Sequence, residues 1–337
     1  TSKDFRFKMR VWFLKETKTI DVDCGTGTNI TLWTREDKVY RITPRQNDAV
    51  NSCWMPDSHR LNYKYINAET RIPKPVIRTD AEAPHRPSTW EPALASAAEA
   101  VKRIAPNQLA IIASGRMTNE ELYMVRHLAA QIGTDMVDIV PRMGESDGML
   151  ISADRNPNTN GARLVLDIEP GSRLDAIREG VRSGSIKGIL SLGEDLISPE
   201  AGFTAEDLDK LDYLFMTAHS ANETARHADL VLPGVTYAEK FGTMINVTGR
   251  IQRLNRAIQP IGYARDDWQI FRDITLLLGG NPALKDFNSA LDILTAMSTE
   301  YGALNGVSWG SIGDGGQPIL ETGVTIPVVE REKNQGR

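Results

Sequence analysis

The sequence predicts an α/β fold, a doubly wound and mainly parallel sheet with a small β module at its N-terminal end. Short apolar runs alternate with amphipathic helical segments from about residue 93 onward, turn residues separate the two kinds of segment, and the first part of the chain shows only strand-like segments. Parallel strands joined by helices are covered on both faces, and they therefore appear in a sequence as short apolar runs.

The N-terminal module is expected over residues 1–66. Its strand-like segments are rich in β-branched and aromatic residues and are separated by turn-forming residues: 10–14, 29–34 and 38–43. Five prolines follow within residues 67–92, too many for a helix or a central strand, so this stretch is expected to be extended. It leads into the main α/β domain, expected over residues 67–325, and a charged, flexible tail is expected over residues 326–337.

The main domain opens with a strand, a turn and a helix. The apolar run 108–113 predicts a buried strand, and Thr118 with Glu121 forms a capping-box pattern that predicts a helix start. Apolar residues then recur on one helical face until Gly133, which predicts the helix end.

The same alternation continues along the chain. Further strands are expected at 188–193, 213–217 and 229–233, a helix before the first of them, a short helix near Ser220, an irregular loop at 144–161, and late helices at 268–278 and 290–301.

Composition excludes several classes of function. The 337 residues carry a formal net charge of -5 and no basic arm, which argues against a nucleic-acid partner. No apolar stretch approaches the roughly 20 residues that cross a bilayer, so membrane insertion is not expected. Two cysteines, Cys24 and Cys53, cannot make a disulfide framework and indicate a reducing, cytoplasmic compartment. Because the chain begins at Thr1 without an apolar leader, we expect an excised fragment.

Motifs for nucleotide or metal binding are weak. Ser114-Gly115-Arg116 follows a predicted strand, but no glycine-rich phosphate motif accompanies it, and a plain turn is the favoured interpretation. The five histidines lack metal-ligand spacing, and His219, just beyond a predicted strand, is interpreted as a loop histidine with satisfied hydrogen bonds. A free-standing nucleotide-binding protein stays open as an alternative.

Four stretches resemble known families. Residues 229–253 resemble the A-D-x-V-L-P…E…G-T…N…G-R-x-Q segment of the molybdopterin oxidoreductase superfamily, and residues 264–270 are similar to its continuation. Residues 1–12 and 156–162 resemble parts of the large iron–sulfur subunit, or G subunit, of NADH:quinone oxidoreductase (respiratory complex I).

The resemblance implies that the chain is the C-terminal part of a bacterial G subunit, with a molybdopterin-oxidoreductase-like fold and a structural, accessory role. The parent complex passes electrons from NADH through flavin and iron–sulfur clusters to quinone. The 2Fe–2S and 4Fe–4S clusters of the large iron–sulfur subunit would lie upstream of Thr1, the partners would be other subunits of the hydrophilic arm, and the location would be cytoplasmic and peripheral to the inner membrane.

Some relatives carry a further 4Fe–4S cluster in the module that residues 1–66 resemble. Aligned with their four cysteines, this chain has Asp21, Cys24, Thr28 and Pro56. A cluster needs thiolate ligands, so we expect these to be degenerate former cluster positions and no metal, cofactor or catalytic residue in this chain. Cys53, three residues before Pro56, leaves Thr28 without a substitute, and both cysteines are expected to be packing residues.

Active molybdenum enzymes of the superfamily resemble a longer, four-domain body that encloses paired pterins. This chain is too short to supply both walls of such a site. We therefore interpret the residues of the similar segment as determinants of turns and packing: Glu239, Gly242, Thr243, Asn246 and Arg250.

Two further alternatives stay open from the resemblance. One is a fragment of a molybdopterin-dependent oxidoreductase of the formate dehydrogenase type. The other is a subunit of an NAD-linked hydrogenase or formate dehydrogenase, whose related subunits share the N-terminal stretch.

Overall fold

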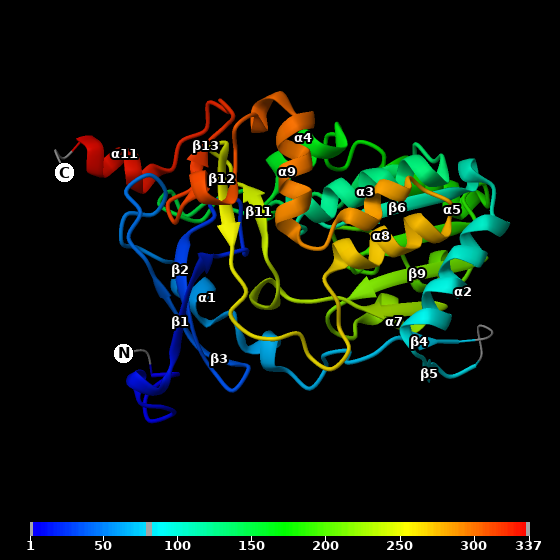
Figure 1. Cartoon of the computed structure of the whole chain (residues 1–337), viewed down its shortest axis with the longest axis horizontal. Coiled ribbons are helices and arrows are strands. Elements are labelled where there is room, and N and C mark those ends of the chain that lie inside the picture. The colour runs from blue at the N-terminus through cyan, green and yellow to red at the C-terminus, as the bar shows by residue number, and fades with distance from the viewer. Residues whose placement is uncertain (1–2, 79–82, 335–337) are drawn as a thin grey trace.

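The computed structural model describes residues 3–78 and 83–334 (Figure 1). An antiparallel N-terminal sheet forms one end, and a seven-stranded sheet covered by helices forms the other. The mixed α/β architecture predicted from the sequence is confirmed.

The N-terminal sheet is an antiparallel meander of β1 (Lys15–Ile20), β2 (Asn29–Arg35) and β3 (Lys38–Pro44). The strands predicted at 29–34 and 38–43 are confirmed, but the strand predicted at 10–14 is wrong. Residues Val11–Phe13 form a single 3₁₀ turn, η1, with exposed side chains. The apolar run 10–14 has no partner strand among the described residues, whereas Lys15–Ile20 pairs with β2 although its first residues are polar. Strand pairing, rather than local propensity, therefore determines where the first strand lies.

The large sheet has the strand order β5-β4-β10-β9-β8-β6-β7, and the five strands from β10 to β7 run parallel. Its members are β4 (Val76–Ile77), β5 (Arg86–Pro87), β6 (Leu109–Ala113), β7 (Val137–Ile139), β8 (Gly188–Leu192), β9 (Tyr213–Ala218) and β10 (Leu230–Pro233). Within its described residues, the proline-rich stretch supplies two short antiparallel strands at one end of the sheet, β4 and β5, as its extended character predicts. The prediction is wrong for residues 90–92, which form the first turn of α2 (Trp90–Arg103), where a proline is tolerated.

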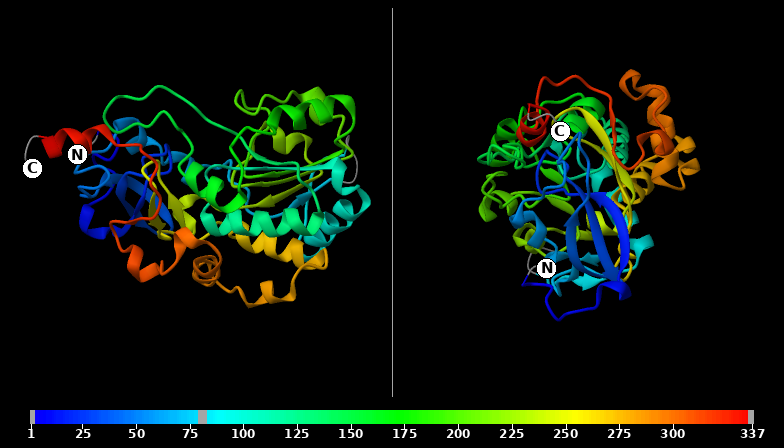
Figure 2. Two further views of the ribbon diagram at one scale, coloured as in Figure 1. Left: turned by 90° about the horizontal axis from the view of Figure 1, so that it is seen from above. Right: turned by 90° about the vertical axis from the view of Figure 1, so that its left-hand side faces the viewer.

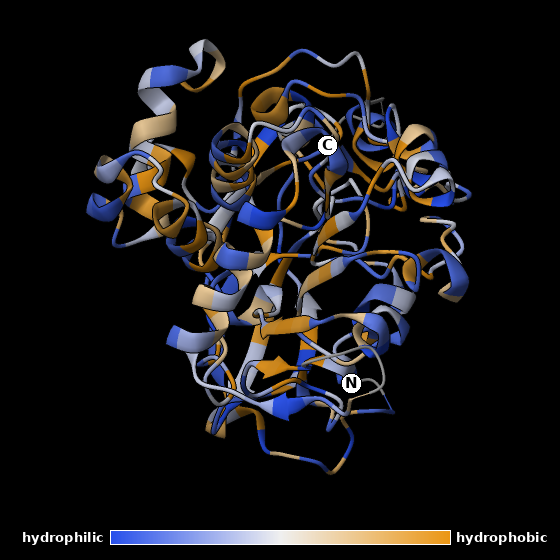
Figure 3. Ribbon diagram, turned by 90° about the vertical axis from the view of Figure 1, so that its right-hand side faces the viewer, coloured by the Kyte–Doolittle hydropathy of each residue, from blue (hydrophilic) through white to orange (hydrophobic). Residues whose placement is uncertain are grey.

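Helices cover both faces of this sheet, as Figure 2 shows from above. Leu109, Ile111 and Ala113 of β6 join one core cluster, whereas Ala110 and Ile112 join the other. The first face packs against α2 (Trp90–Arg103), α3 (Asn119–Ile132), α4 (Thr159–Leu166), α8 (Asp267–Leu277) and α9 (Ala290–Glu300); the second packs against α5 (Leu174–Ser183), α6 (Ala205–Leu208) and α7 (Glu223–His227). Figure 3 shows apolar residues concentrated in the strands between these layers. The sheet is therefore doubly wound, as predicted.

The start and the end of α3 lie where its capping residues and its terminal glycine predict them. Thr118 Oγ1 accepts the amide of Glu121, and the Glu121 carboxylate accepts the amide of Thr118, which is the predicted capping box. Gly133 ends the helix with φ 79°, a left-handed conformation that favours glycine. The loop expected at 144–161 is irregular until Thr159, where α4 begins.

A third sheet joins the two ends of the molecule. The hairpin of β11 (Gly242–Ile245) and β12 (Arg250–Leu254) pairs with β13 (Gln317–Pro318). The remaining elements are α1 (Asp57–Leu61), α10 (Trp309–Ile312), α11 (Pro327–Asn334), and the 3₁₀ turns η2 (Lys64–Asn67), η3 (Pro106–Gln108), η4 (Tyr237–Glu239), η5 (Pro282–Asp286) and η6 (Gly302–Leu304).

The flexibility expected of the tail at 326–337 stays a prediction, and the described part of the tail is helical. Residues 327–334 form α11, and Val328 and Val329 are buried in a small cluster with Val50 and Leu150. Two adjacent valines on a short helix bury enough apolar surface to hold it, although charged residues follow them. Residues 335–337 lie outside the described residues.

The N-terminal sheet shares its core with the later chain. Ile30 and Leu32 of β2 are fully buried in one cluster with Tyr237, Met244 and Leu254. The boundary at residue 66 therefore stays a prediction, because the core crosses it. In the part of the chain that the structure describes, no helix combines the length and apolar composition of a bilayer crossing.

Candidate functional site

The carboxyl ends of the parallel strands enclose a small cavity. The chain leaves β6 for β7 on one side, while β8 lies on the other side of β6, so the loops after β6 and β8 diverge, which is where open α/β sheets bind ligands. The cavity measures about 100 Å³. Its wall combines the loops at the strand ends with two residues near the N-terminal sheet, one after β1 and one in η2. The lining residues are Val22, Tyr65, Ser114, Arg116, Met117, Gly193, Ala218, His219, Gly234, Val235, Thr236, Tyr237, Lys240 and Asp267.

His219 lies in this wall as a hydrogen-bonded histidine. Its Nδ1 is 2.9 Å from Ser220 Oγ, and its ring centroid is 5.5 Å from that of Tyr65. Burial, together with the positive charges of Arg71 and Lys240, lowers its pKa to about 4. The imidazole is therefore neutral at physiological pH.

The loop after β6 is packed against protein atoms. The Ser114 hydroxyl accepts the Arg116 amide at 3.2 Å, and the Gly115 carbonyl accepts the Asn158 amide at 3.1 Å. A Cβ on Gly115 would lie 2.3 Å from the side chain of Asn156, so the glycine allows this close approach. The loop takes the form of a closely packed strand-to-helix turn.

The four positions expected to be former cluster positions lie in a loop and just before a helix. Asp21, Cys24 and Thr28 are buried in the loop between β1 and β2, and Pro56 is the residue before α1. Burial raises the pKa of the Cys24 thiol, and the nearby Asp21 carboxylate adds to the effect. Cys53 is exposed.

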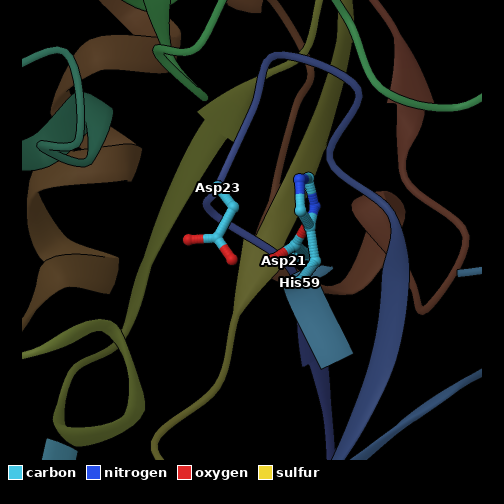
Figure 4. A group of neighbouring side chains, drawn as sticks. All are labelled: Asp21, Asp23 and His59. Carbon is cyan, nitrogen blue, oxygen red and sulfur yellow. The ribbon is translucent and has the colours of Figure 1, made fainter. Parts of the chain in front are cut away.

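The fold brings His59 of α1 onto this loop (Figure 4). Its Nδ1 lies 2.6 Å from Asp21 Oδ2, and both side chains are almost fully buried. Asp23 lies beside this pair, and Asn62 Nδ2 donates to its Oδ1 at 2.7 Å. Burial, followed by the negative charge of Asp21, raises the pKa of Asp23 to about 7. Burial disfavours a charged His59, but its hydrogen bond to Asp21 and the charges of both aspartates outweigh it, so the pKa of His59 is raised.

Sequence spacing missed this group. Asp21 and His59 are 38 positions apart, and a histidine on a short helix carries no ligand signature at that distance. The only available signal was that all three residue types can ligate metals.

Residues 229–253, the segment similar to molybdopterin oxidoreductases, are called the pterin-family segment. Several of its polar side chains form hydrogen bonds with other parts of this chain. Glu239 Oε2 accepts Arg71 Nη2 at 2.6 Å and the Thr236 amide at 2.7 Å, and the Arg71 and Glu239 side chains are each 1% exposed. A Cβ on Gly242 would lie 2.5 Å from Thr118 Cγ2, which places the hairpin directly against the start of α3.

The remaining members of that segment are equally engaged. Thr243 Oγ1 donates to Glu120 at 2.9 Å, Asn246 Nδ2 donates to the Thr26 carbonyl at 3.0 Å, and Arg250 Nη1 donates at 2.7 Å to a carbonyl of the loop before β13. Burial raises the pKa of Glu120 to about 7. These contacts fasten the hairpin to α3 and to the N-terminal loop.

Two families match this chain. Residues 148–275 match molybdopterin oxidoreductase, and residues 14–64 match the NADH-ubiquinone oxidoreductase NDSU1/NuoG-like 4Fe-4S domain. The second match covers the N-terminal sheet and α1, and its range includes Asp21, Cys24, Thr28 and Pro56.

Two of the relatives are subunits of NADH oxidoreductases, and a third is a putative formate dehydrogenase. The mitochondrial NADH-ubiquinone oxidoreductase 78 kDa subunit of Candida albicans is 25% identical and is aligned with 86% of this chain and 56% of its own length. The G subunit of the NADH-quinone oxidoreductase of Rickettsia conorii is 23% identical over 81% of this chain and 57% of its own length. A putative formate dehydrogenase of Staphylococcus haemolyticus is 32% identical over 42% of this chain and 15% of its own length.

The chain spans little more than half the length of the oxidoreductase subunits that it matches. Among solved structures, acetylene hydratase from Pelobacter acetylenicus superposes with a TM-score of 0.58 and 10% identity, covering 88% of this chain and 73% of that enzyme. This likeness shows the fold. The chain is thus related to the G subunits of NADH-quinone oxidoreductases and to the mitochondrial 78 kDa subunits, with one region similar to the NuoG-like 4Fe-4S domain and another similar to molybdopterin oxidoreductase.

Proposed function

We propose that this chain serves as a structural, C-terminal part of the G subunit of a bacterial NADH:quinone oxidoreductase and that it carries no electron itself. Such a complex transfers electrons from NADH to quinone. The 2Fe–2S and 4Fe–4S clusters of the G subunit would then lie in the portion of the longer relatives that precedes the matched region. The observation that carries the proposal is the donor chemistry at the degenerate cluster positions.

Those positions do not fit a 4Fe–4S cluster. Such a cluster takes four thiolates, and the positions hold one thiol, Cys24, with a hydroxyl at Thr28 and no donor at Pro56. Cys24 is 0% exposed, and burial raises the pKa of its thiol. This environment suits a small buried packing residue.

The small volume of the cavity at the strand ends supports the proposal that this chain binds no pterin. Its volume of about 100 Å³ is well below the roughly 300–1,000 Å³ of ordinary ligand pockets. Two polar side chains of the pterin-family segment already have buried protein partners, Arg71 for Glu239 and Glu120 for Thr243. A pterin would have to break those buried hydrogen bonds, each of which costs about 1–3 kcal/mol when one partner is left unpaired.

The partners follow from the same proposal. The chain would contact other hydrophilic-arm subunits on the cytoplasmic side, peripheral to the inner membrane. Exposed aromatic side chains near the start of the chain, Phe7, Trp12 and Phe13, offer one surface for such contacts.

Anaerobic reconstitution with iron and sulfide tests whether the chain holds a cluster. We expect the chain to show neither visible charge-transfer absorption nor an EPR signal after reduction, because one thiolate cannot hold four irons. The matched positive control restores the ligands with Asp21→Cys, Thr28→Cys and Pro56→Cys. A 4Fe–4S signal near one per chain in the unmodified protein would overturn the proposal.

Electron transfer in the whole complex gives a second readout. Cys24→Ser should leave NADH:quinone activity within about twofold of the parent, because a packing thiol passes no electrons. A loss beyond tenfold in a complex that retains all its subunits would contradict a structural role.

The formate dehydrogenase relative favours a second candidate, a fragment of a molybdopterin-dependent oxidoreductase. Molybdenum and pterin analysis of the purified chain separates the two. Stoichiometric molybdenum would support this candidate, and its absence together with co-purification of hydrophilic-arm subunits supports the first.

A further inference from the structure

We propose that Asp21, Asp23 and His59 form a mononuclear site for a divalent transition metal, best matched by Zn²⁺. The site lies in the loop between β1 and β2 and the facing helix α1, within the region similar to a 4Fe-4S domain (Figure 4). It does not depend on the proposed function, because a zinc ion carries no electron.

Geometry brings the three ligand groups together. Each residue offers one ligand atom, and the three atoms lie within 4.8 Å of one another. Two ligand atoms of a tetrahedral zinc ion at 2.0–2.2 Å lie about 3.4 Å apart. Metal binding therefore requires the more distant atoms to approach and the Asp21 and His59 atoms, 2.6 Å apart, to separate slightly. The side chains of Asp21 and His59 are 3% and 8% exposed, which limits competition from water.

The hydrogen bonds inside the group leave ligand atoms available. Asn62 occupies Oδ1 of Asp23, while Oδ2 has no hydrogen-bond partner among residues 3–78 and 83–334. The imidazole of His59 points its Nδ1 at Asp21 Oδ2, so a metal held by both residues would lie between these two atoms, in place of the proton that they share.

A separate observation points to a missing ligand. Thr28 lies opposite Asp21 in the continuation of the β1–β2 ladder, with the Asp21 amide 2.8 Å from the Thr28 carbonyl. If the ladder continues by this one pair, the two side chains share a face of the sheet, with the Thr28 hydroxyl on the side of Asp21. That hydroxyl is fully buried and has no hydrogen-bond partner among the described residues. A metal-bound water beside Asp21 would supply the partner.

Charge and ligand type select the ion. The two carboxylates repel each other in a partly buried loop, and a divalent cation cancels their combined charge. Ca²⁺ and Mg²⁺ prefer six or more oxygen ligands, whereas imidazole with carboxylates suits Zn²⁺. Three protein ligands and one water complete the tetrahedral coordination of zinc.

The test is metal binding by the purified whole chain. After chelator treatment, Zn²⁺ or Co²⁺ is added, bound metal is counted by mass spectrometry, and Co²⁺ is followed through its visible absorption. We expect one ion per chain and a rise of several degrees in melting temperature with Zn²⁺. Asp23→Asn and His59→Gln should each weaken Zn²⁺ binding at least 30-fold and abolish the thermal shift.

A matched control separates this site from any histidine–aspartate pair. His227 Nδ1 lies 2.8 Å from Asp209 Oδ1 on the surface, so His227→Gln removes a similar pair and should leave binding unchanged. Cys24→Ser should also leave it unchanged. Circular dichroism of metal-free variants shows whether they fold. Retained Zn²⁺ affinity in a folded His59→Gln variant, or a cobalt–thiolate charge-transfer band that Cys24→Ser removes, would overturn the assignment.

Discussion

At the residue scale, the pair between Arg71 and Glu239 is the most deeply buried ion pair among the described residues. Both side chains are 1% exposed, and the two residues are 168 positions apart. The sequence marked Glu239 as a packing determinant but held no indication of its partner. A buried charge needs a counter-charge and hydrogen bonds, and only the folded chain shows which cation supplies them.

Glu239→Ala should lower the free energy of unfolding by about 3–5 kcal/mol, because it leaves the Arg71 guanidinium buried without its counter-charge. Urea denaturation measures the change. The exposed pair Arg163–Glu169 provides the control, with side chains 48% and 62% exposed. Glu169→Ala should cost no more than about 1 kcal/mol, and equal losses at the two sites would contradict a special role for burial.

At the element scale, local chemistry predicted well where it fixes a backbone conformation. The capping box of Thr118 and the left-handed Gly133 bound α3 as expected. The strand predicted at 10–14 is wrong because an apolar run becomes a strand only when a partner strand pairs with it. The β11–β12 hairpin, whose turn contains Gly249, was not predicted from the sequence. Its residues were interpreted only as part of a family motif and not as strands.

Alanine substitutions at Gly249 and Gly306 distinguish the energetic cost of backbone strain from the cost of steric crowding. Their φ angles are +77° and +74°, but a Cβ on Gly249 would lie 2.2 Å from the Leu320 carbonyl oxygen, whereas one on Gly306 meets nothing within 4 Å. Gly306→Ala should cost about 1–2 kcal/mol from conformation alone. Gly249→Ala should cost more than that, since the clash is with backbone. Equal costs by thermal or urea denaturation would show that the C-terminal loop yields freely.

At the scale of the whole molecule, the N-terminal sheet and the later chain share one core. Ile30 and Leu32 pack with Tyr237 and Leu254, and the amide of Val247 donates to the carbonyl of Gly25. The division near residue 66 follows the sequence pattern, whereas burial follows the assembled fold. The sheet that carries the candidate metal site therefore depends on residues 237–258.

We expect calorimetry to show one unfolding transition for the chain, because a shared core couples the two parts. Tyr237→Ala should also speed hydrogen exchange in β2, although the substitution lies far away in the sequence. Two separated transitions, with exchange in β2 unaffected by Tyr237→Ala, would indicate that residues 1–66 fold as an independent unit.

The sequence by itself determined the alternation of strands and helices, the bounds of α3 and the family segments, because periodicity, caps and turn residues act within a few positions. Only the tertiary structure decided which side chains meet: His59 with Asp21, Arg71 with Glu239, and α11 with Val50 and Leu150. The physical reason is that such contacts form between residues distant in the chain once all elements have packed, and no local pattern encodes their separation.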